Sequence, residues 1–199
     1  GGEAEGLPPS SIQLVPFTDR ESVKEMASMD RYLDLIIPRG GKGLIETVVS
    51  LARMPVIKHY DGICHVFVDE AADLEMARLI TVDAKTQKRG VFNALETLLV
   101  HEEVAEKLLP EVASSLACRG VELRACQRAE EILGEEVGAA TEEDWRAEYL
   151  DLILSIKVVA SKEEAIEHIN LYGSHHTDCI VTGDRESAEK FLREVDSAC

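Results

Sequence analysis

A basic, glycine-marked loop near the middle of the chain is the first candidate for chemistry. Residues 85–93 read KTQKRGVFN, and an apolar run follows directly. Lys88 and Arg89 give the loop positive charge, which could hold an anionic group of a substrate. A loop of this kind often presents a nucleophile, yet the residue before Asn93 is Phe92, which cannot attack a carbonyl carbon.

A second basic turn, PRGGK at residues 38–42, lies between an apolar run and a helical pattern. Backbone N–H groups at a helix N-terminus attract phosphate, and Gly40 and Gly41 would let a ligand approach closely. Arg39 and Lys42 would add positive charge. The pattern is neither GxGxxG nor a P-loop, because a glycine follows Lys42. A phosphate-binding turn and a tight turn with solvated basic residues both stay open.

Two further groups of residues have chemically interesting types. Cys64 and His65 could form a thiolate–imidazolium pair, but neighbours on a strand point to opposite faces, so we expect Cys64 to be a packed core thiol. His175 and His176 lie in a loop without suggestively spaced metal ligands. We therefore expect no metal there, and a hydrogen-bonding role toward a substrate or a neighbouring loop. Glu148, before a long apolar run, is typical of a surface residue or a helix-dipole partner.

The overall composition excludes several classes of protein. The 199 residues carry 38 acidic and 21 basic side chains, a net charge of -17, which repels nucleic acid. No apolar run approaches the ~20 residues that span a bilayer, and the first residues lack the features of a signal peptide. We expect a soluble cytoplasmic protein. The five cysteines form no CxxC pair, which favours reduced, mostly buried thiols over disulfides or zinc.

Short apolar runs alternate with amphipathic stretches along the chain. We predict strands at 11–15, 32–38, 54–58, 64–69, 96–100, 120–125, 150–159 and 178–182. We predict helices at 19–29, 42–52, 73–84, 102–118, 127–133, 162–171 and 184–194. Capping signals support several helices, such as Asp19 before the first and the pair Ser161 and Glu164 at the sixth. This alternation predicts an α/β fold with a mostly parallel, twisted sheet flanked by helices.

These segments, in this order, resemble the γ-glutamyl phosphate reductases, the glutamate-5-semialdehyde dehydrogenases of proline synthesis in the aldehyde dehydrogenase superfamily. The resemblance runs from about residue 6 to the end of the chain. It rests on YLDLIIPRGGKGLI, PVIKHYDGICHVFVD, AKTQKRGVFNALETLLVH, GVELRA and the stretch from AEYLDLILSIKVV to DCIVT. It implies NADPH-dependent reductive dephosphorylation of γ-glutamyl phosphate through a cysteine thiolate.

The resemblance also implies roles for particular residues. The family's nucleophilic cysteine lies between Val and Asn in GVCNA, and Phe92 occupies that position here, next to Asn93. The turn from Arg39 through Gly40 and Gly41 to Lys42 would lie on the cofactor side. Glu148 falls where the superfamily has a glutamate that touches the nicotinamide ribose. Lys88 and Arg89 would lie beside the acyl phosphate, and His175 and His176 on the substrate side.

The resemblance further implies that the chain is a central piece of the enzyme. Residues 1–60 would be the C-terminal part of the NADPH-binding domain, and residues 61–199 a catalytic domain without its last strands, ending before the NASTRF and GAEIGIST segments. We therefore expect weak or absent NADPH binding, because the first βαβ unit is missing, and little or no reductase activity. The alternative is a non-catalytic domain that self-associates as a homo-oligomer through an open sheet edge.

Overall fold

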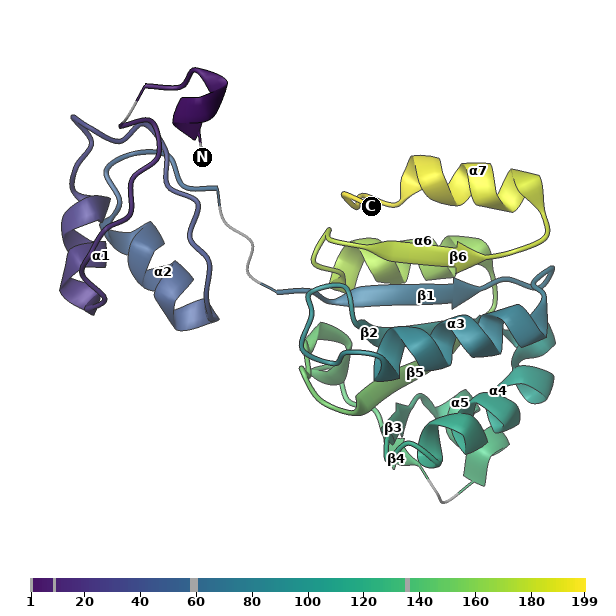
Figure 1. Cartoon of the computed structure of the whole chain (residues 1–199). Helices are drawn as coiled ribbons and strands as arrows, with labels where there is room; N and C mark the ends of the chain where they lie inside the picture. Colours follow the sequence, from purple (N-terminus) through teal and green to yellow (C-terminus); the bar gives the residue numbers. More distant parts are fainter. Residues whose placement is uncertain (1, 9, 58–60, 135–136) are drawn as a thin grey trace. The chain divides into compact units, whose positions relative to one another are not determined.

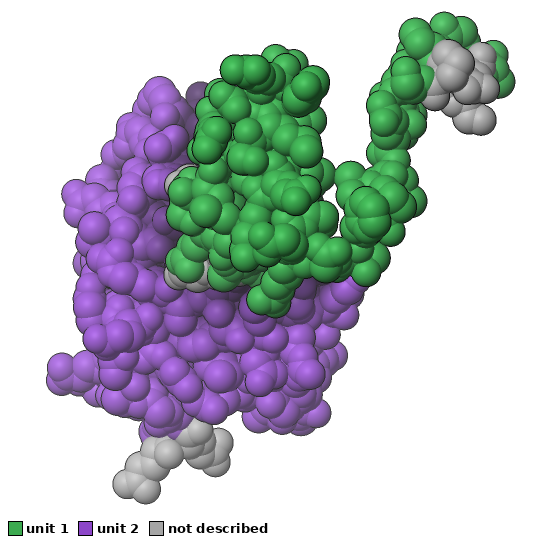
Figure 2. All heavy atoms as spheres, turned by 90° about the vertical axis from the view of Figure 1, so that its left-hand side faces the viewer, with its two compact units in different colours: residues 1–60 green, residues 61–199 purple. Residues whose placement is uncertain are grey.

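The computed structural model describes residues 2–8, 10–57, 61–134 and 137–199. The chain divides into two compact units, residues 1–60 and 61–199, which Figure 2 distinguishes by colour. Each unit is described by itself below. Within the described residues, none of the helices combines the length and apolarity that crossing a membrane requires.

Unit 1 (residues 1–60) contains the short 3-10 helix η1 (Gly2–Glu5) and the helices α1 (Arg20–Ala27) and α2 (Lys42–Leu51). Asp19 caps α1, as its position in the sequence indicates, by accepting a hydrogen bond from the Ser22 N–H at 2.9 Å. The strand prediction at 11–15 is wrong, because these residues pair with no other segment of the described chain. The predictions at 32–38 and 54–58 are reduced to one parallel bridge between Ile36 and Val56. Residue 58 lies outside the described residues.

Unit 2 (residues 61–199) is built on a six-stranded sheet with the order β4-β3-β5-β2-β1-β6. Its strands are β1 (Cys64–Val68), β2 (Leu95–His101), β3 (Glu122–Ala125), β4 (Gly138–Ala139), β5 (Ile153–Val159) and β6 (Asp178–Val181). Every pairing between them is parallel. The prediction of an α/β fold with a mostly parallel sheet is therefore confirmed. Only the two-residue strand β4 was missed, because it is too short to show a pattern.

Helices cover both faces of this sheet, as Figure 1 shows. They are α3 (Leu74–Thr86), α4 (Glu102–Ala117), α5 (Gln127–Leu133), α6 (Lys162–Tyr172) and α7 (Arg185–Glu194), with the 3-10 helix η3 (Asp144–Arg146) before β5. Each α-helix agrees with its predicted range to within about two residues. At α6, Ser161 Oγ accepts the Glu164 N–H at 3.2 Å as predicted. The Glu164 carboxylate accepts the Ala160 N–H at 2.9 Å, one residue before the position that a capping box predicts.

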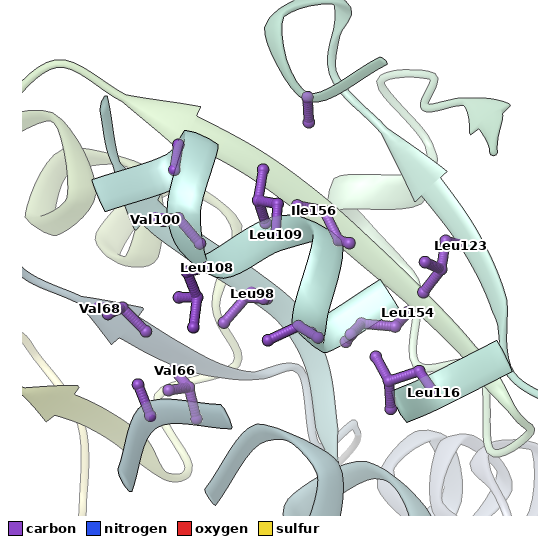
Figure 3. Close-up of a cluster of buried hydrophobic side chains, with 14 of the residues drawn as sticks. Val66, Val68, Leu98, Val100, Leu108, Leu109, Leu116, Leu123, Leu154 and Ile156 are labelled. Atoms are coloured by element: carbon purple, nitrogen blue, oxygen red, sulfur yellow. The ribbon is translucent and has the colours of Figure 1, made fainter. Parts of the chain in front are cut away.

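The core lies in two layers, one on each face of the sheet. Alternate strand residues face α4 and its neighbours, and Figure 3 shows Leu108, Leu109 and Leu116 of α4 against them. The strand residues of this layer include Val66, Val68, Leu98, Val100, Leu123, Leu154 and Ile156. The intervening residues, such as Phe67 and Leu99, pack on the opposite face with residues of α6 and α7. A sheet buried on both faces explains why these strands read as nearly continuous apolar runs.

Candidate functional site

The segments that carry the predicted site residues of unit 2 meet at the amino ends of the strands. Phe92 lies three residues before β2, Glu148 five residues before β5, and His176 two residues before β6. Because all strands run parallel, these loops lie at the same end of the sheet, where the strands begin. Ligands of open α/β sheets more often bind at the carboxyl ends of the strands, so sheet topology alone predicts a site at the opposite end from these residues.

Phe92 lies at the surface at this end of the sheet, with 38% of its area exposed. Its ring stacks on the imidazole of His176, with 6.2 Å between the ring centroids and an interplanar angle of 29°. Asn93 is exposed beside it. The loop closes on itself through a hydrogen bond of 3.0 Å from the Ala94 N–H to the Val91 carbonyl. The loop thus presents an aromatic ring, packed on a histidine, at the position where the resemblance predicts a thiol.

The first residues of unit 2 hold the main chain of Phe92 closely. The Cys64 thiol donates to the Phe92 carbonyl oxygen at 3.2 Å. A Cβ atom built on Gly62 would lie 2.0 Å from that same oxygen, so only glycine fits there without displacing the loop. Glu148 accepts the Gly62 N–H at 2.9 Å. It is half-buried and therefore more enclosed than the sequence predicted.

Cys64 is a packed core thiol, as predicted. It is 3% exposed, and burial, reinforced by the charge of Asp178, raises the pKa of its thiol to about 12. His65 bonds through Nδ1 to Asp178 Oδ1 at 2.8 Å, so Cys64 and His65 are engaged with different residues. Cys64 therefore stays protonated near neutral pH and cannot serve as a replacement nucleophile.

The other cysteines correct the expectation of mostly buried thiols. Cys118 and Cys199 are exposed, and Cys126 and Cys179 are half-buried. Cys118 caps the C-terminus of α4 and Cys199 is the last residue, and both are positions where side chains reach solvent.

The two cations of the Phe92 loop, Lys88 and Arg89, are exposed at the same end of the sheet. Arg89 pairs with Asp151 at 3.0 Å, with more than half of each side chain exposed. Beneath them lies a buried ion pair that sequence reasoning missed, Lys85 with Glu96 at 2.7 Å. Two features of the sequence could have indicated this ion pair. One is the glutamate inside the apolar run of β2, and the other is the lysine on the packed face of α3.

The two histidines are bonded to different groups. The Nδ1 of His175 lies 2.6 Å from the Asp196 carbonyl oxygen, and its φ of 60° is a left-handed conformation. His176 bonds to Thr177 Oγ1 at 2.7 Å. Among the residues that the structure describes, no group of three or more His, Cys, Asp or Glu side chains could hold a metal ion.

A compact polar network supports the segment that carries Glu148. Asp144 accepts hydrogen bonds from the Arg124 guanidinium at 2.5 Å, and from the Thr141 N–H and the Tyr149 hydroxyl at 2.8 Å each. Burial alone would raise the pKa of Asp144, but these donors hold it well below its usual range. The network ties the first residue of η3 to Thr141 before it and to Tyr149, the neighbour of Glu148.

The glycine-rich turn lies in unit 1. Gly40 has φ 153°, and a Cβ atom there would lie 2.7 Å from Leu44 Cδ2. Gly41 is the N-cap of α2 and makes no side-chain cap, and Lys42 is the first helical residue. A hollow of about 650 Å³ lies beside this helix start. It is lined by Arg20, Val23, Lys24, Gly41, Gly43, Leu44 and Thr47.

No model of a known protein family matches the chain. It is 51% identical to a γ-glutamyl phosphate reductase of Geobacter metallireducens over 98% of this chain and 47% of that protein. The crystal structure of γ-glutamyl phosphate reductase from Thermotoga maritima aligns with a TM-score of 0.90 and 48% identity, over 96% of this chain and 46% of the other. An acetylating aldehyde dehydrogenase from Geobacillus thermoglucosidasius shares the fold, with a TM-score of 0.71 and 21% identity over 98% of this chain and 51% of the other. The resemblance to the reductases and the aldehyde-dehydrogenase-like fold are confirmed, and the chain spans about half the length of these proteins.

Proposed function

We propose that the protein derives from a γ-glutamyl phosphate reductase, a cytoplasmic NADPH-dependent oxidoreductase of proline synthesis, and that this chain does not perform the covalent step. The observation that carries the second part is Phe92 at the position of the nucleophile. Its benzyl group has no atom that can form a thioester. The buried, protonated Cys64 next to it cannot take over.

The reaction of a thiol at position 92 shows what the phenylalanine removes. A thiolate there would attack the γ-carbonyl carbon of γ-glutamyl phosphate, form a C–S bond and expel inorganic phosphate. NADPH, when bound, supplies the hydride that reduces the resulting thioester, after which the semialdehyde leaves and the thiolate is regenerated. Lys88 and Arg89 would stabilise the negative charge of the phosphoryl group. His176, which stacks on residue 92, would border the substrate.

Features of unit 1 support a contribution to cofactor binding. The α2 N-terminus has no side-chain cap, so its N–H groups suit a phosphate, and Arg20 and Lys24 line the adjoining hollow. These groups suit the pyrophosphate of NADPH, and the sequence adds the positive charges of Arg39 and Lys42 to the same turn. We propose that binding by this chain is weak, because a dinucleotide normally occupies a crevice between two complete βαβ halves.

Restoring the thiol tests the proposal. The chain and its Phe92→Cys variant are incubated with acetyl phosphate, a stable acyl phosphate, and acyl adducts are located by peptide mass spectrometry. We expect an adduct at residue 92 of the variant, and only background reaction at the exposed Cys118 and Cys199 in both proteins. NADPH oxidation by the unaltered chain that survives Cys64→Ala would contradict the proposal, because no thiol at the site would then be needed.

A second candidate is a non-catalytic, self-associating domain, and the position of β6 favours it. β6 is the last strand of the sheet order. Among the described residues, the backbone hydrogen bond on its outer side lies at its start, where the Asp178 N–H donates to the Cys199 carbonyl at 3.1 Å. An uncovered strand edge pairs readily with a second copy.

A further inference from the structure

Every residue from Gly62 to His65 makes a hydrogen bond to a residue in, or at the border of, one of the loops around position 92. The Gly62 N–H donates to Glu148 at 2.9 Å, and the Ile63 N–H donates to Ser174 Oγ at 2.9 Å. The Cys64 thiol donates to the Phe92 carbonyl at 3.2 Å. The His65 N–H and its ring Nδ1 both bond to Asp178 at 2.8 Å.

These partners come from three loops that are far apart in sequence. Phe92 belongs to the loop before β2 and Glu148 to the loop before β5. Ser174 and Asp178 enclose the loop with His175 and His176. The single segment at the start of β1 is thus bonded to all three.

We propose that Gly62–His65 is the template that fixes the main chain of position 92 and holds the flanking loops in register with it. Cys64 and Gly62 are its positioning residues for that carbonyl, and neither takes part in the chemistry. That the side chain at position 92 takes part in chemistry rests on the proposed function. The template adds to that function by identifying the residues that set the position of the residue 92 main chain.

Burial makes the Cys64 hydrogen bond consequential. The Cys64 thiol is 3% exposed, so its removal would take one hydrogen-bond donor from the Phe92 carbonyl on a side that is buried. Gly62 acts by shape, because its missing Cβ leaves the space that the Phe92 oxygen occupies. Two different substitutions therefore disturb the same main-chain atom by independent routes.

Hydrogen exchange of the 199-residue chain tests the template without substrate or cofactor. In Cys64→Ala we expect exchange in the peptide containing residues 90–95 to rise about threefold to tenfold, the range for one lost hydrogen bond. Cys64→Ser keeps a donor and should stay within about twofold of the unaltered chain. The matched control is Cys179→Ala, which removes a half-buried thiol from β6 whose hydrogen bond, at 3.6 Å, goes to the Ile180 carbonyl.

The glycine pair gives a second comparison. Gly62→Ala should also accelerate exchange of the loop, whereas Gly90→Ala, with nothing within 4 Å of its Cβ position, should not. Equal exchange in Cys64→Ala and Cys179→Ala would overturn the template even if Gly62→Ala failed to fold. Acylation of Phe92→Cys is measured separately, so a failure of the proposed function and a failure of the template give different results.

Discussion

At the scale of single residues, His168 is a buried group whose environment differs strongly from that of a free side chain. It lies on α6, and within the described part of the chain neither of its ring nitrogens has a hydrogen-bond partner. Its ring contacts Trp145, Tyr172 and His65 at centroid distances of 5.4, 4.5 and 5.6 Å. Burial, followed by the charges of His65 and Lys157, lowers the pKa of His168 to about 3. The imidazole is therefore neutral in the folded protein and acts as an aromatic packing group.

This depressed pKa makes His168 a source of acid sensitivity. The unfolded chain binds a proton at residue 168 below about pH 6.5, whereas the folded chain does so only near pH 3, so stability is lost as the pH falls between these values. We expect His168→Phe to flatten the pH dependence of the unfolding free energy by up to about 1.4 kcal/mol per pH unit in this range. At pH 7.5 the variant should be at least as stable, because two unsatisfied nitrogens are removed. Urea unfolding from pH 4 to 7.5 measures both effects, and an unchanged slope would contradict the assignment.

At the scale of elements, the ion pair of Lys85 and Glu96 joins the end of α3 to the beginning of β2. The register between β1 and β2 pairs Cys64 with Leu95 and His65 with Thr97, so Glu96 is an extra residue in the ladder. A bulge of this kind redirects a side chain, and here the carboxylate reaches the lysine. Burial raises the pKa of Glu96 to about 7 and lowers that of Lys85. The pair lies directly beneath the loop of Phe92 and holds its two ends together.

A double-mutant cycle measures this connection. Lys85→Met leaves a buried carboxylate without its partner and should cost about 3–5 kcal/mol of unfolding free energy at pH 8. The double variant Lys85→Met with Glu96→Leu should recover much of that loss, because no uncompensated charge remains. The exposed pair of Arg89 and Asp151 is the matched control, where Asp151→Ala should cost about 0–1 kcal/mol. Additive effects of the two buried substitutions would show that the ions do not depend on each other.

The elements also show how far the sequence predicts this molecule. Helices were predictable because each has an amphipathic period and most have a capping residue, such as Asp19 or Ser161. Strand predictions succeeded in unit 2, where partners exist, and failed at residues 11–15, where an apolar run has no sheet to join. The position of Phe92 could be predicted only through the resemblance. Its contacts with Gly62 and Cys64 could not, because they depend on which strand ends lie side by side.

At the scale of the whole molecule, the parallel sheet of unit 2 has two edge strands, β4 and β6. The β4 edge consists of two residues, which offer little backbone for pairing. At the β6 edge, the carbonyl oxygens of His175 and His176 accept hydrogen bonds from the N–H groups of Ala198 and Cys199 at 3.2 and 3.1 Å. These bonds cover the amino end of the strand and leave its remainder as the longest exposed edge of the described sheet.

Deleting residues 197–199 should strengthen self-association through this edge. The deletion removes the Cys199 carbonyl that the Asp178 N–H now uses, together with the Ser197 hydroxyl that bonds to the Asp178 side chain. A second copy could then pair along all four residues of β6, and unpaired strand edges favour such pairing. We expect the shortened chain to form dimers at lower concentration than the full chain in light scattering over a dilution series. The control is Leu192→Lys, which adds charge on α7 at a residue 78% exposed. Monomers of both chains at every concentration would exclude the β6 edge as an interface, and dimers abolished by Leu192→Lys would place the interface on α7 instead.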